Sequence, residues 1–536
     1  MFNFATAEEL VLRLVLALGN AVLICLMAYK LIHIFQLSGY RAKGLAKWTT
    51  DRRNKFYIRL FALSLLSFGS MIVVNILFRN FDESTQRWSQ LGLFFYLFFA
   101  TIFIVIVHKE KARISLKFTS RVRRFYILLG IIGFFATMAT LWLADQISHV
   151  RFALIAIFPV LLPWIVIMTH FIILPLESLL KWRFIFIARR KLNKPEYANL
   201  IKIGITGSFG KTSCKNILRD MLAKKYNVAT SPSSYNTPMG FTRTVNNVLK
   251  PEHEILIMEM GARYRNDIKY LAKLVQPHHG ILTSIGKAHL DTMKDLDGVK
   301  AIKGELIKAL PPEGVGILNG DIDRCIQVHD EITLDNKHLV GLKDVNNINM
   351  TPDGCIFEFL GTKFTTQLLG LHNIQNIVMS AKLAHELGVS LDQIAEAVSE
   401  LKPTPHRLEL IKSSNGVTIL DDSYNATPTG IAAALKVLDL FKGKKVVQTP
   451  GLVEMGLKAL EENYKIGIKI AGVADTVIVV GEFNKQALTD GLLAAKFDKD
   501  NIHYAKTLDD AKALYGTLLK KGDTLLISND LPDNYI

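Results

Sequence analysis

The chain has 536 residues, enough for about three or four domains at roughly 150 residues each. Half of it is hydrophobic, its mean hydropathy is +0.24 and only 21% of it is charged, which excludes a largely disordered chain. The four cysteines (Cys25, Cys214, Cys325 and Cys355) show no paired spacing, so a disulfide scaffold and a cysteine-rich zinc site are excluded.

The net charge of +16 is unevenly distributed along the chain. Residues 1–195 hold 25 Lys and Arg against 8 Asp and Glu, whereas the remainder holds 39 against 40. The excess positive charge therefore lies in the half that is also the more apolar. This combination predicts a membrane domain with basic cytoplasmic loops, and no nucleic-acid partner.

Five apolar stretches in this half are long enough to cross a hydrocarbon core of about 30 Å. They run roughly over residues 10–35, 56–78, 89–108, 125–145 and 152–175. The first is not a cleaved signal, because Glu8 and Glu9 precede it and no small-residue cleavage site follows it. The pattern predicts an N-terminal α-helical membrane domain of five spans, and with it membrane lipid as a partner.

Loop charge predicts the orientation of these spans. Loops 36–55 and 109–124 carry six and seven Lys or Arg, whereas 79–88 and 146–150 carry few. The positive-inside rule then predicts a multi-pass protein of the cytoplasmic membrane, with its N-terminus outside and everything after residue 176 in the cytoplasm. Residues 180–192 fit either an amphipathic connector in the membrane interface or a simple helical linker.

The pattern changes at about residue 198 to short β-rich runs that alternate with helical ones. The β-rich runs include residues 201–206, 254–260, 280–285, 476–481 and 524–528. Such alternation predicts an α/β fold with mainly parallel sheets.

A phosphate-binding loop is expected at residues 204–213, between a strand-like run and a helical one. Its glycines let backbone N–H groups face phosphate oxygens, while Lys211 can reach the terminal phosphates and Thr212 can bind Mg²⁺. The first glycine, Gly204, stands one place earlier than in the usual GxxxxGK[ST] spacing. The loop predicts that the chain binds a nucleoside triphosphate.

Polar residues also stand where α/β proteins place their ligands, near the ends of β-rich runs. Glu259 and His289 follow two such runs, Asp421 and Asp422 follow a third, and Lys303 lies in an expected helix. Taken singly, each is equally well explained as a solvated charge or a structural residue. Composition and spacing alone leave these alternatives open.

Together these residues resemble the Mur ligase family, and most closely its D-alanyl-D-alanine-adding branch. The resemblance covers roughly residues 198–536 and rests on separated motifs in the family's order. They are ITGSFGKTS (205–213), SSYNTPMG (233–240), MEMGAR (258–263), TSIGKAHLD (283–291), AIKGEL (301–306), LNGDID (318–323), GLHNIQN (370–376), PTPHRLE (403–409) and DDSYNATP (421–428).

The resemblance implies an ATP-dependent carboxylate–amine ligase that acts through an acyl phosphate. It would add an amino acid or a dipeptide such as D-alanyl-D-alanine to a cell-wall precursor at the cytoplasmic membrane face. The apolar spans and the resemblance together give the expected domains. They are a transmembrane helical domain over 1–195, a P-loop central ATP-binding domain with a mainly parallel sheet over 196–405, and a Rossmann-like α/β C-terminal domain over 406–536. The site would be completed when the last domain closes onto the central one.

The resemblance also implies roles for individual residues. The expected catalytic residues are Lys211, Glu259, His289, Lys303 and Arg407. The expected ATP-binding residues are Thr206, Gly207, Ser208, Gly210, Lys211, Thr212, Ser213, Asn373, Asn376, Arg407 and Asp421. The expected substrate-binding residues are Tyr235, Asn236, Asp422, Tyr424 and Asn425. Two Mg²⁺ ions are expected on Thr212, Glu259, His289 and Lys303, of which Lys303 matches the lysine that is carbamylated in this family.

Three features depart from the family pattern. Residues 1–195 stand in place of the UDP-sugar-binding domain, which suggests a lipid-linked carboxylate acceptor or, alternatively, spans that only anchor the enzyme. His406 stands where glycine is typical, and the segments 449–456 and 527–533 differ in the region expected to meet the amine. A poly-γ-glutamate-type synthase, an ATP-driven transporter or flippase, and a non-catalytic binding module remain alternatives.

Overall fold

The computed structural model describes residues 7–50, 55–77, 85–109, 115–145, 153–232, 234–286, 293, 295–424, 427–453 and 458–529. Two compact units divide the chain, Met1–Trp182 (unit 1) and Arg183–Ile536 (unit 2), and each is described by itself. Two of the predicted site residues, His289 and Asn425, lie outside the described residues, as do the loops 79–84 and 146–150.

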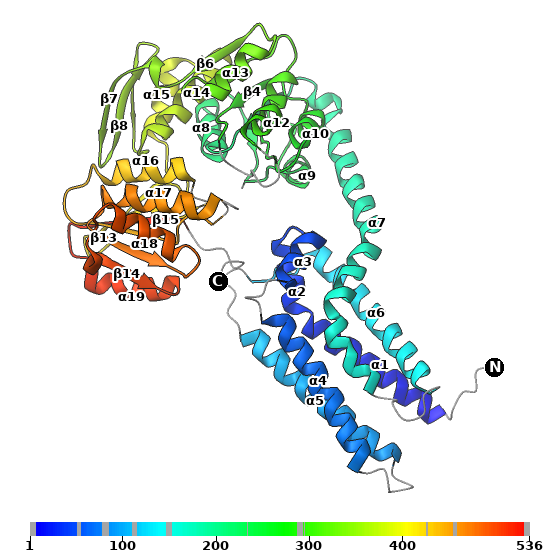
Figure 1. Cartoon of the computed structure of the whole chain (residues 1–536). Helices are drawn as coiled ribbons and strands as arrows, with labels where there is room; N and C mark the ends of the chain where they lie inside the picture. Colours follow the sequence, from blue (N-terminus) through cyan, green and yellow to red (C-terminus); the bar gives the residue numbers. More distant parts are fainter. Residues whose placement is uncertain are drawn as a thin grey trace. The chain divides into compact units, whose positions relative to one another are not determined.

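Unit 1 is helical (Figure 1). Its helices are α1 (Ala7–Met27), α2 (Tyr29–Leu37), α3 (Ala42–Thr50), α4 (Phe56–Leu77), α5 (Thr85–Lys109), α6 (Ser120–Asp145) and the first part of α7 (Phe158–Leu192), which a short 3-10 helix, η1 (Ala153–Ile157), precedes. Helix α1 packs on α6, and α4 packs on α5. The first pair approaches closely at Gly133, where a Cβ would meet the side chain of Ile24 and the backbone of Ala21.

Among the residues that the structure describes, four helical stretches are long and apolar enough to cross a membrane: Leu10–Met27, Phe56–Val74, Ser120–Leu143 and Leu154–Leu192. The prediction of five spans is thus supported for four of them. The remaining one falls in α5, where the described apolar stretch is only Phe94–Lys109. The first predicted stretch is also interrupted, because α1 ends at Met27 and α2 begins at Tyr29.

The last predicted span and the predicted connector form one continuous helix, α7, of 35 residues. Beyond residue 182 this helix packs on the rest of unit 2, where Ile185 and Ala188 join an apolar core. Lys191 Nζ also donates to the backbone carbonyl of Leu249 at 2.7 Å. These contacts favour the simple helical linker over an amphipathic connector.

A six-stranded parallel sheet forms the centre of unit 2, with the strand order β2-β3-β1-β4-β5-β6. Its strands are β1 (Ile201–Thr206), β2 (Val228–Thr230), β3 (Ile255–Glu259), β4 (His279–Leu282), β5 (Gly316–Asn319) and β6 (Lys337–Val340). The helices around it are α8 (Lys211–Leu222), α9 (Pro238–Asn247), α10 (Asp267–Val275), α12 (Leu296–Lys308), α13 (Asp323–Glu331), α14 (Leu371–Glu386) and α15 (Leu391–Ser399). The predicted β-rich runs at 201–206, 254–260 and 280–285 correspond to β1, β3 and β4.

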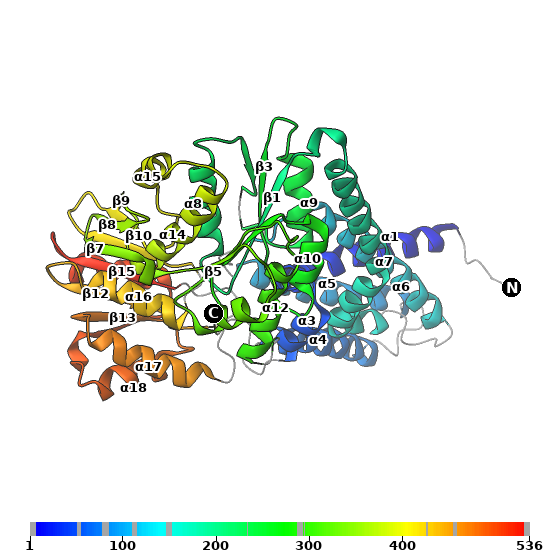
Figure 2. The same cartoon turned by 90° about the horizontal axis from the view of Figure 1, so that it is seen from above.

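Alternate residues of the central strands enter two different cores, since successive side chains of a strand point to opposite faces. Ile255 and Ile257 of β3 pack with α8, α14 and α15, whereas Leu256 and Met258 pack with α9, α10 and α12. Figure 2 shows helices on both sides of the sheet. The strands are buried on both faces, which explains why they are apolar without alternation.

A separate three-stranded antiparallel sheet was not predicted. It consists of β7 (Val345–Thr351), β8 (Gly354–Phe359) and β9 (Thr362–Thr366), in that order. Phe357 and Phe364 stack with ring centroids 5.5 Å apart and join the core formed by α8, α14 and α15. The expectation of mainly parallel sheets holds for the two large sheets and is wrong for this one.

The last part of unit 2 is a second α/β layer with the strand order β10-β11-β15-β12-β13-β14. Its strands are β10 (Glu409–Lys412), β11 (Thr418–Asp422), β12 (Lys445–Thr449), β13 (Thr476–Val480), β14 (Ile502–Ala505) and β15 (Thr524–Ser528), and only β10 is antiparallel. The helices are α16 (Pro428–Leu438), α17 (Ala459–Ala471), α18 (Lys485–Ala494) and α19 (Leu508–Leu518). The predicted runs 476–481 and 524–528 are β13 and β15.

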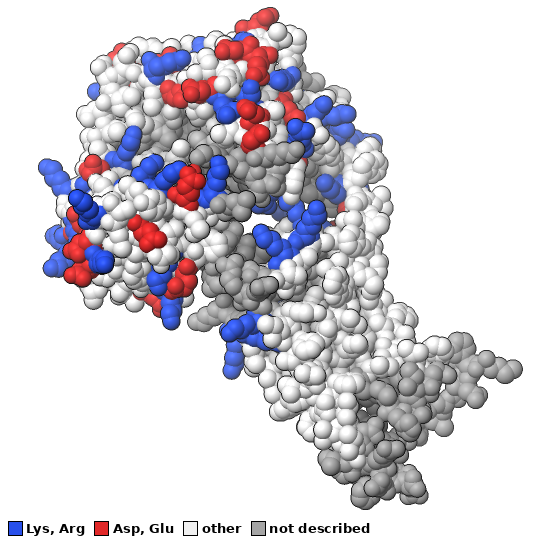
Figure 3. Space-filling model, viewed as in Figure 1, with Lys and Arg blue, Asp and Glu red and all other residues white. Residues whose placement is uncertain are grey.

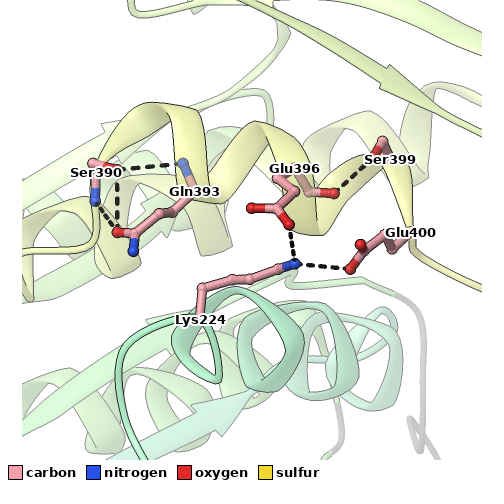
Figure 4. Close-up of polar contacts among 6 residues, drawn as sticks. All are labelled: Lys224, Ser390, Gln393, Glu396, Ser399 and Glu400. Carbon is pink, nitrogen blue, oxygen red and sulfur yellow. Dashed lines mark hydrogen bonds and ion pairs between the residues drawn. The ribbon is translucent and has the colours of Figure 1, made fainter.

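Helices α8 and α15 are joined by surface ion pairs (Figure 4). Lys224, just after α8, donates to Glu396 and Glu400 at 2.9 Å each. Ser390 caps α15 by accepting from the N–H of Gln393 at 3.3 Å, and the Gln393 side chain accepts from the N–H of Ser390 at 3.2 Å. These contacts hold α15 beside the helix that starts at the phosphate-binding loop.

Candidate active site

The predicted phosphate-binding loop follows β1, at the point of the central sheet where the strand order reverses. Strand β1 pairs with β3 on one side and with β4 on the other. The crevice at the carboxyl end of β1 therefore lies between the segments that follow β3 and β4. Such switch points are where open α/β sheets bind ligands. Residues Thr206 to Gly210 occupy this position and lead directly into α8.

Two glycines of the motif serve different purposes. Gly210 has φ 82° and precedes α8, so it occupies a left-handed conformation that glycine adopts without strain. Gly204 lies inside β1, and a Cβ there would come within 2.7 Å of the Leu306 side chain. The early glycine is therefore required for packing α12 on the sheet and is not part of the loop.

The loop is held by the segment that follows β4. Ser284 O accepts from the Ser208 N–H at 2.9 Å, and Ser284 Oγ accepts from the Phe209 N–H at 2.9 Å. Thr283 Oγ1 donates to Phe209 O at 2.6 Å. At the start of the loop, Thr206 Oγ1 donates to Met260 O at 2.9 Å. The loop is thus fixed to both neighbours of β1.

Four polar side chains meet at the first turn of α8. Thr212 Oγ1 donates to Glu259 Oε2 at 2.9 Å, and Asn236 Nδ2 lies 3.4 Å from Glu259 Oε1. Thr212 Oγ1 also lies 3.3 Å from Ser234 Oγ. Glu259 is only 2% exposed, which makes this a buried group of oxygen ligands beside a phosphate-binding loop. Hydroxyl and carboxylate oxygens are the ligands that Mg²⁺ prefers.

Two lysines lie within electrostatic range of this group. Lys211 Nζ donates to Gly207 O at 2.7 Å, and burial lowers its pKa. Lys303 on α12 is 3% exposed, and burial together with the charge of Lys211 holds its pKa well below the usual range. The carboxylates of Asp267 and Glu259 oppose this shift without cancelling it. The ammonium form of Lys303 is therefore less favourable than that of an exposed lysine.

Other predicted ATP-binding residues line one small cavity. Ser213 of α8, Asn373 of α14 and Arg407 face it. Asn376 lies against the loop itself, because a Cβ on Gly210 would come within 2.8 Å of its Oδ1. Arg407 also contributes to the lowered pKa of Lys211, so its charge reaches the loop.

A larger cavity of about 610 Å³ adjoins the first one. The end of α8, the end of α15 and the segment 402–405 line it. Asn216, Lys402 and Thr404 line both cavities. Together they offer continuous space that runs from the phosphate-binding loop along α8.

The predicted residues of the last domain form a cluster of their own. Asp421 Oδ2 lies 2.8 Å from His406 Nδ1, and Asp422 Oδ1 accepts from the Leu408 N–H at 3.2 Å. The Arg407 guanidinium lies over the ring of Tyr424, 4.6 Å from its centroid. Burial raises the pKa of Asp422 to about 7, which the Leu408 N–H opposes.

His406 adopts φ 63°, which explains why a glycine is typical at this place. Its side chain and that of Glu409 lie close enough to Asp421 for three potential ligand atoms to fall within 4.8 Å of one another. No ion is needed to explain this group, because His406 and Asp421 already bind each other.

The structure brings Lys211, Thr212, Asn236, Glu259 and Lys303 together, and it places the loop residues around them. Tyr235 contacts Arg243, whose guanidinium carbon lies over its ring, 5.7 Å from the centroid. Sequence reasoning missed Ser234, Thr283, Ser284 and Asp267. Asp267 begins α10 shortly after β3, and its position near the carboxyl end of a parallel strand is the signal that could have identified it.

Two protein-family models match the chain. The Mur ligase middle domain covers residues 205–384, and the Mur ligase glutamate ligase domain covers residues 406–529. The chain belongs to the Mur ligase family. The predicted enzyme class, an ATP-dependent acid–amino-acid ligase of the Mur type, is confirmed by this membership.

Two curated relatives carry the name UDP-N-acetylmuramoyl-tripeptide–D-alanyl-D-alanine ligase. The Bacillus subtilis protein is 29% identical over 343 residues, which cover 60% of this chain and 72% of that protein. The Escherichia coli protein is 30% identical over 293 residues, which cover 52% of this chain and 64% of that protein. The chain thus spans about two-thirds of the length of these Mur ligases.

Solved structures agree with the sequence matches. MurF from Acinetobacter baumannii superposes with a TM-score of 0.58 at 25% identity, over 65% of this chain and 77% of that one. MurF from Thermotoga maritima, solved in complex with ADP, gives 0.57 at 26% identity, over 65% and 80%. The predicted resemblance to the D-alanyl-D-alanine-adding branch is thereby confirmed.

Proposed function

We propose that this Mur ligase joins a carboxylate to an amine through an acyl phosphate. Its product would be a cell-wall precursor extended by an amino acid or a dipeptide such as D-alanyl-D-alanine, made at the cytoplasmic membrane face. The observation that supports the chemistry best is the Thr212–Glu259 pair at 2.9 Å beside Lys211. The names of the relatives support the choice of substrate.

The residues present fit a divalent cation bound with ATP. Thr212 Oγ1 and the Glu259 carboxylate would hold one Mg²⁺. The positive charge of the ion would stabilise the ionised Glu259 carboxylate, which is only 2% exposed. Bound Mg²⁺ would supply charge stabilisation to the transferred phosphoryl group. His289, which lies outside the described residues, and Lys303 are proposed for a second ion.

Lys303 fits that role only in a modified form, because an ammonium repels a metal ion. Burial and Lys211 lower the pKa of its amine, and the neutral amine can take up CO₂ to give an anionic carbamate with release of a proton. We propose that Lys303 is carbamylated, which would convert a buried base into an oxygen ligand.

The other residues would bind and orient the reactants. Backbone N–H groups of the loop and Lys211 would hold the phosphates. Ser213, Asn373 and Arg407 would border the nucleotide in the cavity that they share. Asp421 would hold the ribose, and Asn236 and Tyr424 would contact the substrates. Closure of the segment after residue 405 would exclude water from the acyl phosphate.

The proposed domains are a membrane domain over 1–195, an ATP-binding domain over 196–405 and a C-terminal domain over 406–536. Four helices that can cross a membrane support the first of these. We propose that the ATP-binding and C-terminal domains lie in the cytoplasm and that the N-terminus lies outside. A carboxylate acceptor linked to a membrane lipid would explain why a Mur ligase carries such a domain.

Phosphate release from ATP by the full chain in detergent tests this function. We expect release with D-alanyl-D-alanine only when a carboxylate acceptor is also present, and mass spectrometry should show the amide. The acceptors to compare are UDP-N-acetylmuramoyl-tripeptide and a lipid-linked peptide extract. Phosphate release driven by glutamate alone, with growing polymers, would instead identify a poly-γ-glutamate-type synthase.

A matched pair of variants makes the test specific. Glu259→Gln should lower kcat/KM by about 100-fold or more, because it removes a charged ligand of the metal. Glu252→Gln, the same change in an exposed turn, should leave it unaltered. Full activity of Glu259→Gln would remove the proposed metal site.

A further inference from the structure

A group of polar side chains in unit 1 has no part in the ligase site. It consists of Gln36 at the end of α2, Tyr40 just after α2, Arg121 and Arg124 in the first turn of α6, and Glu177 on α7. These five residues are called the arginine cluster below. The Glu177 carboxylate lies 2.7 Å from Arg124 Nη2 and 3.6 Å from Arg121 Nε.

Each guanidinium of the arginine cluster is held in place. Arg121 lies over the ring of Tyr40, 3.9 Å from its centroid. Tyr40 is positioned by a left-handed backbone at φ 60° and by an edge-on contact with Phe35 at 5.5 Å. Arg124 donates through both Nε, at 2.8 Å, and Nη2 to one oxygen of Glu177. Cation–π stacking and ion pairing fix the planes of both groups.

The segments that carry the cluster are also tied to each other. Gln36 Nε2 donates to Lys117 O at 2.8 Å, and Gln36 Oε1 accepts from the Lys117 N–H at 3.0 Å. This reciprocal pair joins the end of α2 to the segment that leads into α6. The cluster is therefore part of the fold and not a set of independent surface side chains.

The charge around the cluster is strongly positive. Segments 36–50 and 115–124 together carry seven Lys or Arg and no Asp or Glu. Three of them, Arg121, Arg123 and Arg124, stand in the first turn of α6, where the helix dipole is already positive and disfavours cations. Glu177 compensates only part of this charge. An anionic ligand would compensate the rest.

The guanidinium groups remain accessible to such a ligand, because the side chains of Arg121 and Arg124 are 35% and 34% exposed. Large apolar side chains nearby in the chain are exposed as well: Phe118 at 56%, Leu179 at 62% and Trp182 at 63%. On the face shown in Figure 3, the basic side chains of unit 1 gather toward α3, whereas much of its remaining described surface is uncharged. A ligand with a charged head and an apolar tail matches this arrangement.

We infer that the arginine cluster binds the diphosphate of a lipid-linked substrate, with the lipid chain along the apolar helices of unit 1. Arginine suits this ligand because a guanidinium carries five N–H donors, so Arg124 can bind Glu177 through Nε and Nη2 and still offer other N–H groups to phosphate oxygens. A single glycerophospholipid phosphate carries less charge and fewer acceptor oxygens than a diphosphate. This inference rests on the proposed function, since it supplies the place where a lipid-linked acceptor is held.

The test measures binding to the full chain in phosphatidylcholine nanodiscs. The probe is a fluorescent long-chain polyprenyl diphosphate, and the competitors are phosphatidylglycerol and inorganic diphosphate. We expect saturable binding that unlabelled polyprenyl diphosphate displaces at least about tenfold better than either competitor. Displacement by phosphatidylglycerol at equal concentration would show that the cluster attracts anionic lipids in general, and it would contradict a diphosphate site. Equal displacement by inorganic diphosphate would show that the lipid chain is not recognised.

Matched variants separate the cluster from net charge. Arg121→Gln should weaken binding about tenfold, whereas Arg123→Gln, which removes the same charge from the same turn, should weaken it less than about twofold. Tyr40→Ala should weaken binding several-fold with no change in charge, because it releases the guanidinium of Arg121. Equal losses in the two arginine variants would overturn the inference, and unchanged melting temperatures would exclude misfolding as the cause.

Failure of this inference can be told apart from failure of the proposed function. If the chain forms the amide on a soluble acceptor but does not bind the probe, the proposed ligase function stands and the lipid site is wrong. If the chain binds the probe selectively but releases no phosphate with any acceptor, the lipid site stands and the proposed ligase function is wrong.

Discussion

Lys303 shows how one buried side chain can fix the chemistry of a site. It lies on α12 with 3% of its surface exposed, and its nearest charges are Lys211, Asp267 and Glu259. A protonated amine there would be repelled by Lys211 and deprived of water. The sequence identifies the residue only through the family resemblance, whereas the structure supplies the physical reason for its reactivity.

Replacing Lys303 should therefore separate activity from stability. Lys303→Ala should abolish amide formation, and high bicarbonate should not restore it, because no amine remains to take up CO₂. Activity is measured as phosphate release with both substrates present. Lys269→Ala, an exposed lysine on α10, is the control. A fully active Lys303→Ala variant would remove Lys303 from the site.

Asp422 should make stability depend on pH. Its folded pKa of about 7 lies above the ordinary aspartate value of 3.8, so the native state keeps a proton that the unfolded state loses. The stability from this group is present below pH 3.8 and is lost as pH rises through 7. Asp422→Asn keeps the neutral shape and an acceptor for the Leu408 N–H. It should raise the melting temperature at pH 8.5 by a few degrees, equivalent to roughly 1–2 kcal/mol, and leave it unchanged at pH 4.

The control for this measurement is Asp500→Asn, an exposed aspartate of the same domain. Its melting temperature should follow the wild type at both pH values. An Asp422→Asn variant that is equally stabilised at pH 4 and pH 8.5 would show that packing, and not titration, is responsible.

His406 is expected to compete with the nucleotide for Asp421. Its Nδ1 lies 2.8 Å from Asp421 Oδ2, the carboxylate proposed to hold the ribose. His406→Gly removes this partner and suits the φ of 63°. We expect the KM for ATP to fall roughly threefold to tenfold, about 1 kcal/mol, with kcat nearly unchanged. A higher KM would instead show that His406 helps to position Asp421.

At the scale of elements, unit 1 is joined by a buried polar network between α1, α5 and α6. Tyr96 Oη donates to Asn20 Oδ1 at 2.7 Å, and Asn20 Nδ2 donates to Thr137 Oγ1 at 2.9 Å. Tyr96 and Thr137 are fully buried. Among apolar helices, where the hydrophobic effect contributes little to association, such bonds and close small-residue contacts help to select one arrangement.

Breaking this network should weaken unit 1 measurably. Asn20→Leu leaves the Tyr96 hydroxyl without its acceptor and should destabilise the bundle by about 1–2 kcal/mol. Thermal unfolding of the chain in detergent, followed by reactivity of the partly buried Cys25, provides the measurement. Thr101→Val is the control, because Thr101 is exposed and bonds only to a carbonyl of its own helix. Equal effects of the two changes would contradict a role for the network.

At the scale of the whole molecule, the sequence predicts what depends on local pattern. The strands β1 and β15, the helix α8 after Gly210 and the helix around Lys303 follow from apolar runs and glycine placement. Contacts between distant segments were not predictable in this way. Strand order determines these contacts, and the motifs do not encode it. Examples are the hydrogen bond between Thr212 and Glu259, the hydrogen bonds from the loop to Ser284 and the position of Asp267. The sheet β7-β8-β9 was missed because β7 is mostly exposed and polar, so it lacks the apolar run that marks the other strands.

The boundary between the units leads to a final prediction. From Arg183 onward the described chain has its own cores, and the end of α7 contributes Ile185 and Ala188 to one of them. A chain that begins at Arg183 should therefore fold and melt cooperatively without detergent. A chain that begins at Leu200 should have a melting temperature several degrees lower, because these contacts are gone.

The chain that begins at Arg183 also tests the role of unit 1 in substrate binding. If the arginine cluster holds the acceptor lipid, this chain should keep its kcat on a soluble acceptor, whereas its KM for the lipid-linked acceptor should rise at least about tenfold. An unchanged KM would reduce unit 1 to an anchor.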